Sequence, residues 1–175
     1  TLLTLLLTTW VSLLHAQQDS SSARLLLVHN SPDTTADAVD IYFELEDGTG
    51  LDTLENVPYR EAAAYTSPEI REDTITQVVV KITSNDSTNS DDAALTDTVK
   101  ITGGASYVVV ANGVADTTQG IGLTADDTLT LNASEIVSKG PAAGEAGVIV
   151  HHGSADAPPV SVFNDADNSE LVPFA

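Results

Sequence analysis

The chain contains no cysteine and no methionine, and it has a single tryptophan among 175 residues. Without cysteine it can form no disulfide scaffold, no zinc–thiolate site and no thiol nucleophile. Basic residues are also scarce, because six Lys and Arg stand against 26 Asp and Glu, which gives a formal net charge of −20. Binding to nucleic acid through phosphate neutralisation needs a basic face, so this composition excludes that class of protein.

Hydrophobic residues make up 42% of the chain, which is too large a share for a wholly disordered protein. The length allows one domain of ordinary size, or one domain and part of another. The surface must therefore carry most of the negative charge, and such a surface repels itself in dilute buffer. Two interpretations remain open: an ordinary soluble secreted protein, or a halophilic protein whose hydrated carboxylates keep it soluble at high salt.

An apolar run without charge, LLTLLLTTWVSLL, occupies residues 2–14. These 13 residues are too few to cross a bilayer core as a helix, which needs about 20. Since the run ends near the small residue Ala16, we predict a secretory signal peptide over residues 1–16, a polar spacer over 17–22 and no membrane span in the mature chain. No Met or basic segment precedes the run, so we expect its start to be truncated. The alternative is a buried strand or helix.

The rest of the chain shows short apolar segments separated by turn signals. Residues 39–46 alternate between apolar and polar side chains, and Asp47-Gly48 then supplies a turn. The run RLLLVH at residues 24–29 predicts a strand buried on both faces. Further strands are expected over residues 74–83, 94–101 and 106–111, with a hairpin turn at Thr102-Gly103-Gly104 and a solvated loop over residues 84–92.

This pattern of short strands, with no convincing amphipathic helix, predicts an all-β fold. We expect an antiparallel immunoglobulin-like β-sandwich, and a closed barrel is the alternative.

The sequence also contains an internal repeat. VHHGSAD at residues 150–156 aligns with LVHNSPD at residues 27–33, and VSVF at residues 160–163 aligns with VDIYF at residues 39–43. The offset between the two motif histidines, 152 − 29 = 123 residues, is one domain length. Residues 138–146, SKGPAAGEA, have the composition of a linker. We therefore predict one β-sandwich domain over residues 23–137 and an incomplete second copy over residues 147–175.

The segment VHNSPD at residues 28–33, followed by VDI at residues 39–41, resembles the hallmark of the family called domain of unknown function 4397. The residues that carry the resemblance are His29, Ser31, Pro32, Asp33, Val39 and Asp40, and in the second copy His152, Ser154, Asp156 and Pro158. Residues 56–59 with Tyr65, and GASYVVVANG at residues 104–113, resemble later parts of the family pattern. The resemblance implies exported bacterial or archaeal proteins, tandem copies and a β-sandwich, and it brings no established activity.

His29, Ser31 and Asp33 could form a catalytic constellation, which recurs as His152, Ser154 and Asp156. Nucleophilic catalysis needs a base within hydrogen-bond reach of the serine and a third group that orients the base. The serine lacks the strained elbow of hydrolases, so we favour a structural turn in which Ser and Asp side chains satisfy the backbone. A metal role for His29 with Asp33 is a further alternative.

Calcium is considered separately, because residues 164–170 place oxygen ligands at alternate positions. The weak metal candidates are Asp165, Asp167, Ser169 and Glu170. The segment lacks the glycine and the final bidentate glutamate of an EF-hand, so we expect no metal and no cofactor. The four tyrosines could stack on sugars, but core packing is the favoured interpretation for them.

Together these features predict an exported, non-enzymatic module at the surface or in the envelope of a prokaryotic cell. We expect a structural or adhesive role, with an extracellular protein or glycan as the partner. The alternative is an extracellular hydrolase or metal-dependent enzyme that uses the His-Ser-Asp segment.

Overall fold

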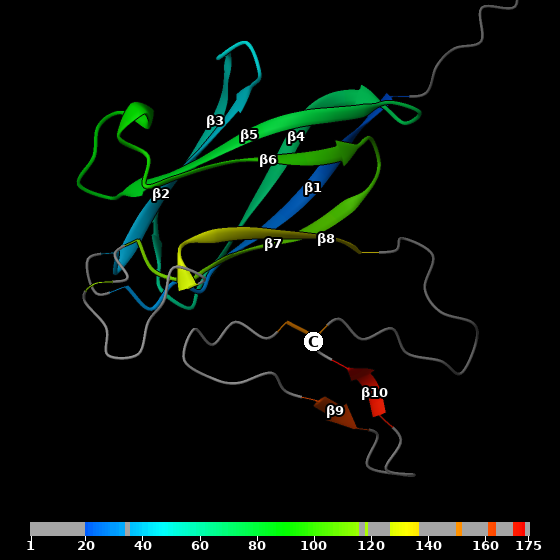
Figure 1. Cartoon of the computed structure of the whole chain (residues 1–175). Coiled ribbons are helices and arrows are strands. Elements are labelled where there is room, and N and C mark those ends of the chain that lie inside the picture. Colours follow the sequence, from blue (N-terminus) through cyan, green and yellow to red (C-terminus); the bar gives the residue numbers. More distant parts are fainter. Residues whose placement is uncertain are drawn as a thin grey trace, which may run out of the picture.

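Alternation of apolar and polar side chains produces two sheets that cover each other, as the computed structural model shows (Figure 1). The structure describes residues 20–33, 36–115, 118, 127–136, 150–151, 161–163 and 170–173. Two four-stranded sheets, in the orders β4-β1-β7-β8 and β3-β2-β5-β6, form the main body. The all-β prediction and the β-sandwich are confirmed.

The first sheet contains β1 (Ser20–His29), β4 (Ala62–Arg71), β7 (Ser106–Asn112) and β8 (Thr130–Ile136). The second sheet contains β2 (Ala38–Leu45), β3 (Gly50–Pro58), β5 (Ile75–Ser84) and β6 (Leu95–Thr102). The 3-10 helix η1 (Ser90–Asp92) lies in the predicted polar loop, and β9 (Ser161–Phe163) pairs antiparallel with β10 (Glu170–Pro173). Within these described parts, no helix is long and apolar enough to cross a membrane.

The core lies between the sheets and is built from the inward-facing residues of both. Leu25 and Leu27 of β1 face Ile41 and Phe43 of β2, and all four are at most 2% exposed. Phe43 stacks on Tyr65 of β4 with 3.8 Å between ring centroids. Such stacked aromatic contacts join the two layers and add to the free energy gained from burial.

The prediction that β1 is buried on both faces is wrong. Leu25 and Leu27 are buried, whereas Leu26 between them is 41% exposed. In a two-layer sandwich each sheet has only one covered face, so an apolar run still alternates between the core and the outside.

The first sheet is mixed rather than antiparallel, which corrects the predicted arrangement. β1 runs parallel to β7, while its other neighbour, β4, is antiparallel. The expected hairpin at Gly103-Gly104 is also wrong, because β6 and β7 belong to different sheets. A Cβ on Gly103 would lie 2.5 Å from the Ile70 carbonyl oxygen and 2.8 Å from that of Ser21, so only glycine allows the chain to cross between layers here.

Candidate functional site at one end of the first sheet

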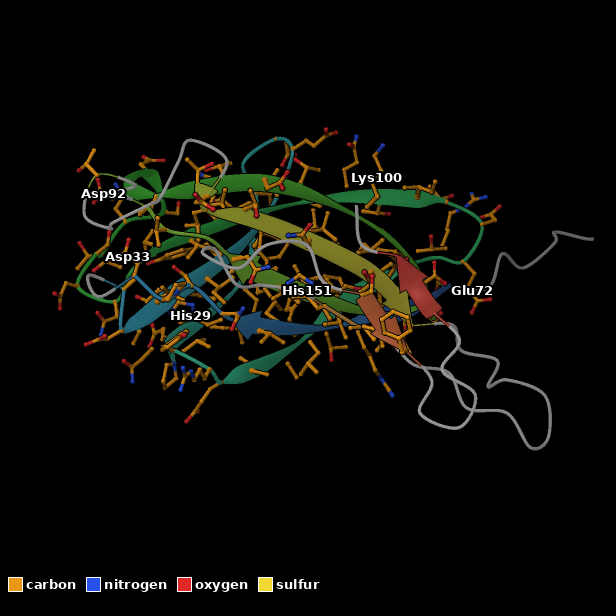
Figure 2. All side chains as sticks on the ribbon, turned by 60° about the horizontal axis from the view of Figure 1, so that its bottom comes forward. His29, Asp33, Glu72, Asp92, Lys100 and His151 are labelled. Carbon is orange, nitrogen blue, oxygen red and sulfur yellow. The ribbon has the colours of Figure 1, made fainter. Side chains whose placement is uncertain are left out.

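The sequence motif lies where β1 ends and the loop to β2 begins. His29, Ser31 and Asp33 are buried, with exposures of 1%, 2% and 9%. Pro32 between them is exposed. Figure 2 places His29 and Asp33 at the same end of the sandwich.

Polar groups of this loop bind the chain that follows β7. The Ser31 hydroxyl donates to the Gly113 carbonyl at 2.7 Å, and the Ala115 amide donates to Asp33 Oδ2 at 2.9 Å. The Asn30 backbone amide donates to the Ala111 carbonyl at 2.9 Å. These bonds continue the parallel pairing of β1 and β7 past the ends of both strands, so the loop after β1 is fixed by side chains where the ladder stops.

His29 is held by its ring and by its backbone. Nε2 donates to the Ala36 carbonyl at 2.8 Å, which leaves Nδ1 unprotonated in the neutral ring. The Arg60 amide donates to the His29 carbonyl at 2.8 Å, and the Tyr59 ring packs edge-on with centroids 5.9 Å apart. Among the described residues Nδ1 has no hydrogen-bond partner.

These contacts separate the histidine from the serine. His29 binds the carbonyl of Ala36, Ser31 binds the carbonyl of Gly113, and no hydrogen bond of the described residues joins the two side chains. A general base must lie within hydrogen-bond reach of the nucleophile that it activates. The observed geometry is therefore that of a structural clip, which we define as His29, Ser31 and Asp33 with their backbone partners.

The cavity beside the clip is small, with a volume of about 70 Å³. Its lining is mainly apolar and includes Ala36, Val39, Ile82, Ala111 and Leu129 as well as His29 and Ser31. Pockets that hold substrate-sized ligands are usually several hundred Å³, roughly 300 or more. This cavity has room for a few water molecules and not for such a ligand.

A comparison with known protein families identifies the family of the chain. The family model described as "Domain of unknown function (DUF4397)" matches residues 23–163, which is most of the chain. The chain belongs to the DUF4397 family. A search of curated proteins finds no match for it.

Two further motif residues of this DUF4397 chain support β2. Val39 is in the core at 3% exposure, and Asp40 is 8% exposed. Asp40 Oδ1 accepts from the Asn56 amide at 2.7 Å, where Asn56 has a positive φ of 54° and the β2–β3 register shifts. The Asp40 carboxylate therefore holds the irregular part of β3 against β2.

Several predicted residues lie outside the described part of the DUF4397 chain. These are His152, Ser154, Asp156, Pro158, Asp165, Asp167 and Ser169, while Glu170 is the first residue of β10. Residues 1–16 and 138–146 also lie outside it. Among the residues that are described, no group of three or more His, Asp or Glu side chains could hold a metal ion.

The tyrosines do not form one exposed face. Tyr65 and Tyr107 are buried, at 2% and 6% exposure, and burial raises the pKa of the Tyr65 hydroxyl. The Tyr107 hydroxyl accepts from the Thr102 amide at 3.0 Å and so joins the two sheets. Both Tyr65 and Tyr107 therefore pack in the core, which is the interpretation favoured from the sequence.

Sequence reasoning missed Asn30, Asn112 and Gly113 as members of the site. Asn30 Nδ2 donates to Asn112 Oδ1 at 2.7 Å, and the Asn112 amide in turn contacts His151 Nε2. Gly113 has a φ of +86°, and a Cβ there would collide with the carbonyl oxygens of Asp127 and Thr128. The only signal was the end of the segment GASYVVVANG, which places Asn112 and Gly113 directly after the strand expected over residues 106–111.

Proposed function

We propose that this DUF4397 chain is an exported, non-catalytic β-sandwich module with a structural or adhesive role at the surface or in the envelope of a prokaryotic cell. Its partner is an extracellular protein or glycan that binds through loops or through a sheet face. The observation that carries the proposal is the clip, because its polar side chains are used to fasten a loop. His29, Ser31 and Asp33 each bind backbone groups.

Export is supported by the apolar run at residues 2–14 followed by Ala16. The test is to express the chain with its native start and to sequence the N-terminus of the protein found outside the cytoplasm. A mature chain that begins at Gln17 supports cleavage of residues 1–16. A chain retained in the cytoplasm with its apolar run intact contradicts export.

We also propose that the sandwich is immunoglobulin-like and is the first of at least two tandem copies, and this part of the proposal is supported by the two sheet orders and by the sequence repeat. β9 (Ser161–Phe163) aligns with part of β2 in the sequence repeat, and it pairs antiparallel with the next strand, β10, as β2 pairs with β3. A second copy that starts as the first one does would form this same hairpin.

One pair of variants separates a module from a hydrolase. For a module, His29→Ala and Ser31→Ala lower the free energy of unfolding, and neither wild type nor variants hydrolyse p-nitrophenyl acetate or p-nitrophenyl glycosides. Thr98→Ala, at an exposed position of β6, is the control and should leave stability nearly unchanged. Turnover in the wild type that disappears in a variant with unchanged stability would establish the alternative, an extracellular hydrolase or metal-dependent enzyme.

Binding and cofactors need their own measurements. We expect the purified chain to bind isolated cell-wall polysaccharide or an envelope protein fraction, and failure on both would contradict an adhesive role. Calorimetry with calcium at millimolar concentration should give no heat, since we propose that the module needs no cofactor. For a halophilic module, the melting temperature should rise with NaCl to molar concentration, because salt screens the net charge of −20.

A further inference from the structure

The outer side of the first sheet carries a patch without any acidic residue. Cross-strand pairing places its members in three rows: Thr66, Arg24, Ser106 and Ile136; Ala64, Leu26, Val108 and Ser134; Ala62, Val28, Val110 and Asn132. We call these twelve residues the acid-free face. The whole chain has 26 acidic residues against six basic ones, so a patch of this size with one Arg and no carboxylate stands out against the rest of the composition.

Exposure varies along the acid-free face. Leu26 and Ile136 are 41% and 38% exposed, whereas Val110 is only 6% exposed although its side chain points away from the core. Leaving Leu26 and Ile136 in water forgoes the free energy that burial would give. Val108 of β7 lies between the strands that carry Leu26 and Ile136, and apolar side chains gathered on one face in this way mark contact sites in soluble proteins.

A segment far along the chain reaches the covered end of this face. The Asn112 amide contacts Nε2 of His151, and Asn112 is two residues beyond Val110 on the same side of β7. Asn112 Oδ1 already accepts from Asn30, so the Asn112 amide is the donor and His151 Nε2 is the acceptor. The segment at residues 150–151 lies below β7 and β8 in Figure 1, and His151 lies in front of the first sheet in the turned view of Figure 2.

The repeat explains why His151 is available for this contact. His151 aligns with Val28, whose side chain belongs to the acid-free face, and His152 aligns with the inward-facing His29. Adjacent residues of a strand point to opposite sides. In a second copy His152 would serve its own clip, and His151 would point outward toward a neighbour.

We propose that the acid-free face is the docking surface for the second copy of the domain in the same chain, with His151 anchored on Asn112. This inference rests on the tandem arrangement proposed above. An array assembled in this way is a stiff rod, because each copy packs on the one before it, whereas copies joined only by flexible linkers would move independently.

The absence of cysteine makes the test direct, since two introduced cysteines carry the only spin labels. We would label Glu135→Cys at the edge strand β8 together with Ser161→Cys in β9, and measure the distance distribution by pulsed electron resonance. A docked second copy gives one narrow distribution. A broad distribution, typical of a tethered but undocked segment, would overturn the proposal.

Variants of the acid-free face complete the test. Leu26→Asp, Val110→Asp and Asn112→Ala should each broaden the distribution, because they place a carboxylate on the face or remove the anchor. Val79→Asp is the matched control, since Val79 faces outward on the second sheet, and it should leave the distribution narrow. The melting temperature of each variant shows whether the sandwich itself is intact, and Leu26→Asp, at an exposed position, keeps the test valid if Val110→Asp unfolds.

Three outcomes separate this proposal from its alternatives and from the proposed function. Dipolar coupling between chains that carry one label each would mean that a second molecule occupies the face, which overturns docking within the chain. A broad distribution in the parent chain would overturn the docking proposal and leave the exported-module proposal standing. Enzymatic turnover would overturn the proposed function and leave the distances unchanged.

Discussion

The two sheets of the sandwich use polar residues in opposite ways. The second sheet carries them on its outer side: Lys81 of β5 and Glu44 of β2 form an ion pair of 2.8 Å there, with side chains that are 19% and 13% exposed, and Tyr42 and Lys100 lie on the same side. The first sheet buries polar groups in the clip at its end and presents the acid-free face outside. The acidic charge of the chain is therefore not spread evenly over the surface.

This difference indicates which sheet face favours contact with another domain or molecule and which favours water. A face with several charged side chains is costly to dehydrate, while a face of mostly apolar and neutral side chains, with Arg24 as its one charge, costs less. The clip has a related role, because it fixes the loop at the end of β1 beside the Asn30–Asn112 pair. Changes in the first sheet should then cost more stability than matched changes in the second.

The largest contrast is expected between two glycines with nearly the same positive φ. Gly113, beside the first sheet, has a φ of +86°, and Gly48, in the β2–β3 turn of the second, has a φ of +83°. A Cβ on Gly113 meets backbone oxygens, but a Cβ on Gly48 meets nothing within 4 Å. Gly113→Ala should cost roughly 3 kcal/mol or more of unfolding free energy, and Gly48→Ala about 1 kcal/mol.

Urea unfolding of both glycine variants measures this contrast. Similar losses for the two would show that backbone strain alone matters and that the chain after β7 is not tightly packed against residues 127–128.

A pair of serines gives a contrast of intermediate size. The buried Ser31 hydroxyl is the donor to the Gly113 carbonyl, whereas the half-buried Ser90 hydroxyl donates to Glu44 Oε1 at 2.8 Å on the second sheet. Ser31→Ala leaves a buried carbonyl without its donor and should cost about 1–3 kcal/mol. Ser90→Ala should cost roughly 0.5 kcal/mol or less, because water replaces the lost bond. Equal costs in urea unfolding would argue against the clip as a stabilising element.

The sequence predicted the central strands and missed most of the edges. The strands β1, β2, β5 and β7, which have a neighbour on each side, were all expected. The strands β3, β4 and β8 were not, and each lies at the edge of its sheet. Edge strands are covered less completely, so their sequences need not alternate sharply; β8 is exposed at six of its seven positions. Register and strand direction, such as the parallel β1–β7 pair, depend on contacts that no local pattern encodes.

Only part of the site could be predicted from the sequence, namely its side-chain members and not their backbone partners. Ser31 and Asp33 were identified because their side chains do the binding, and the predicted turn role agrees with their hydrogen bonds. Their partners at Gly113 and Ala115 are backbone groups 82 residues away. Nearly every residue has the same backbone groups, so the sequence does not show which of them will bind. Among these backbone partners, only Gly113 could be recognised by its residue type, because its positive φ requires glycine.

The smallest expected effect concerns the ion pair of the second sheet and depends on pH. The hydrogen bond from Lys81 is the main cause that lowers the pKa of Glu44 below its ordinary value of 4.5. Because the folded pKa lies below the unfolded one, the pair stabilises the fold fully above pH ~4.5, and this contribution is lost as pH falls through the lower folded pKa. Compared with wild type in urea unfolding, Glu44→Gln should lose about 1 kcal/mol or less at pH 7, and the difference should vanish near pH 3. A difference that persists at pH 3 would mean that Glu44 stabilises the sheet by packing and not by its charge.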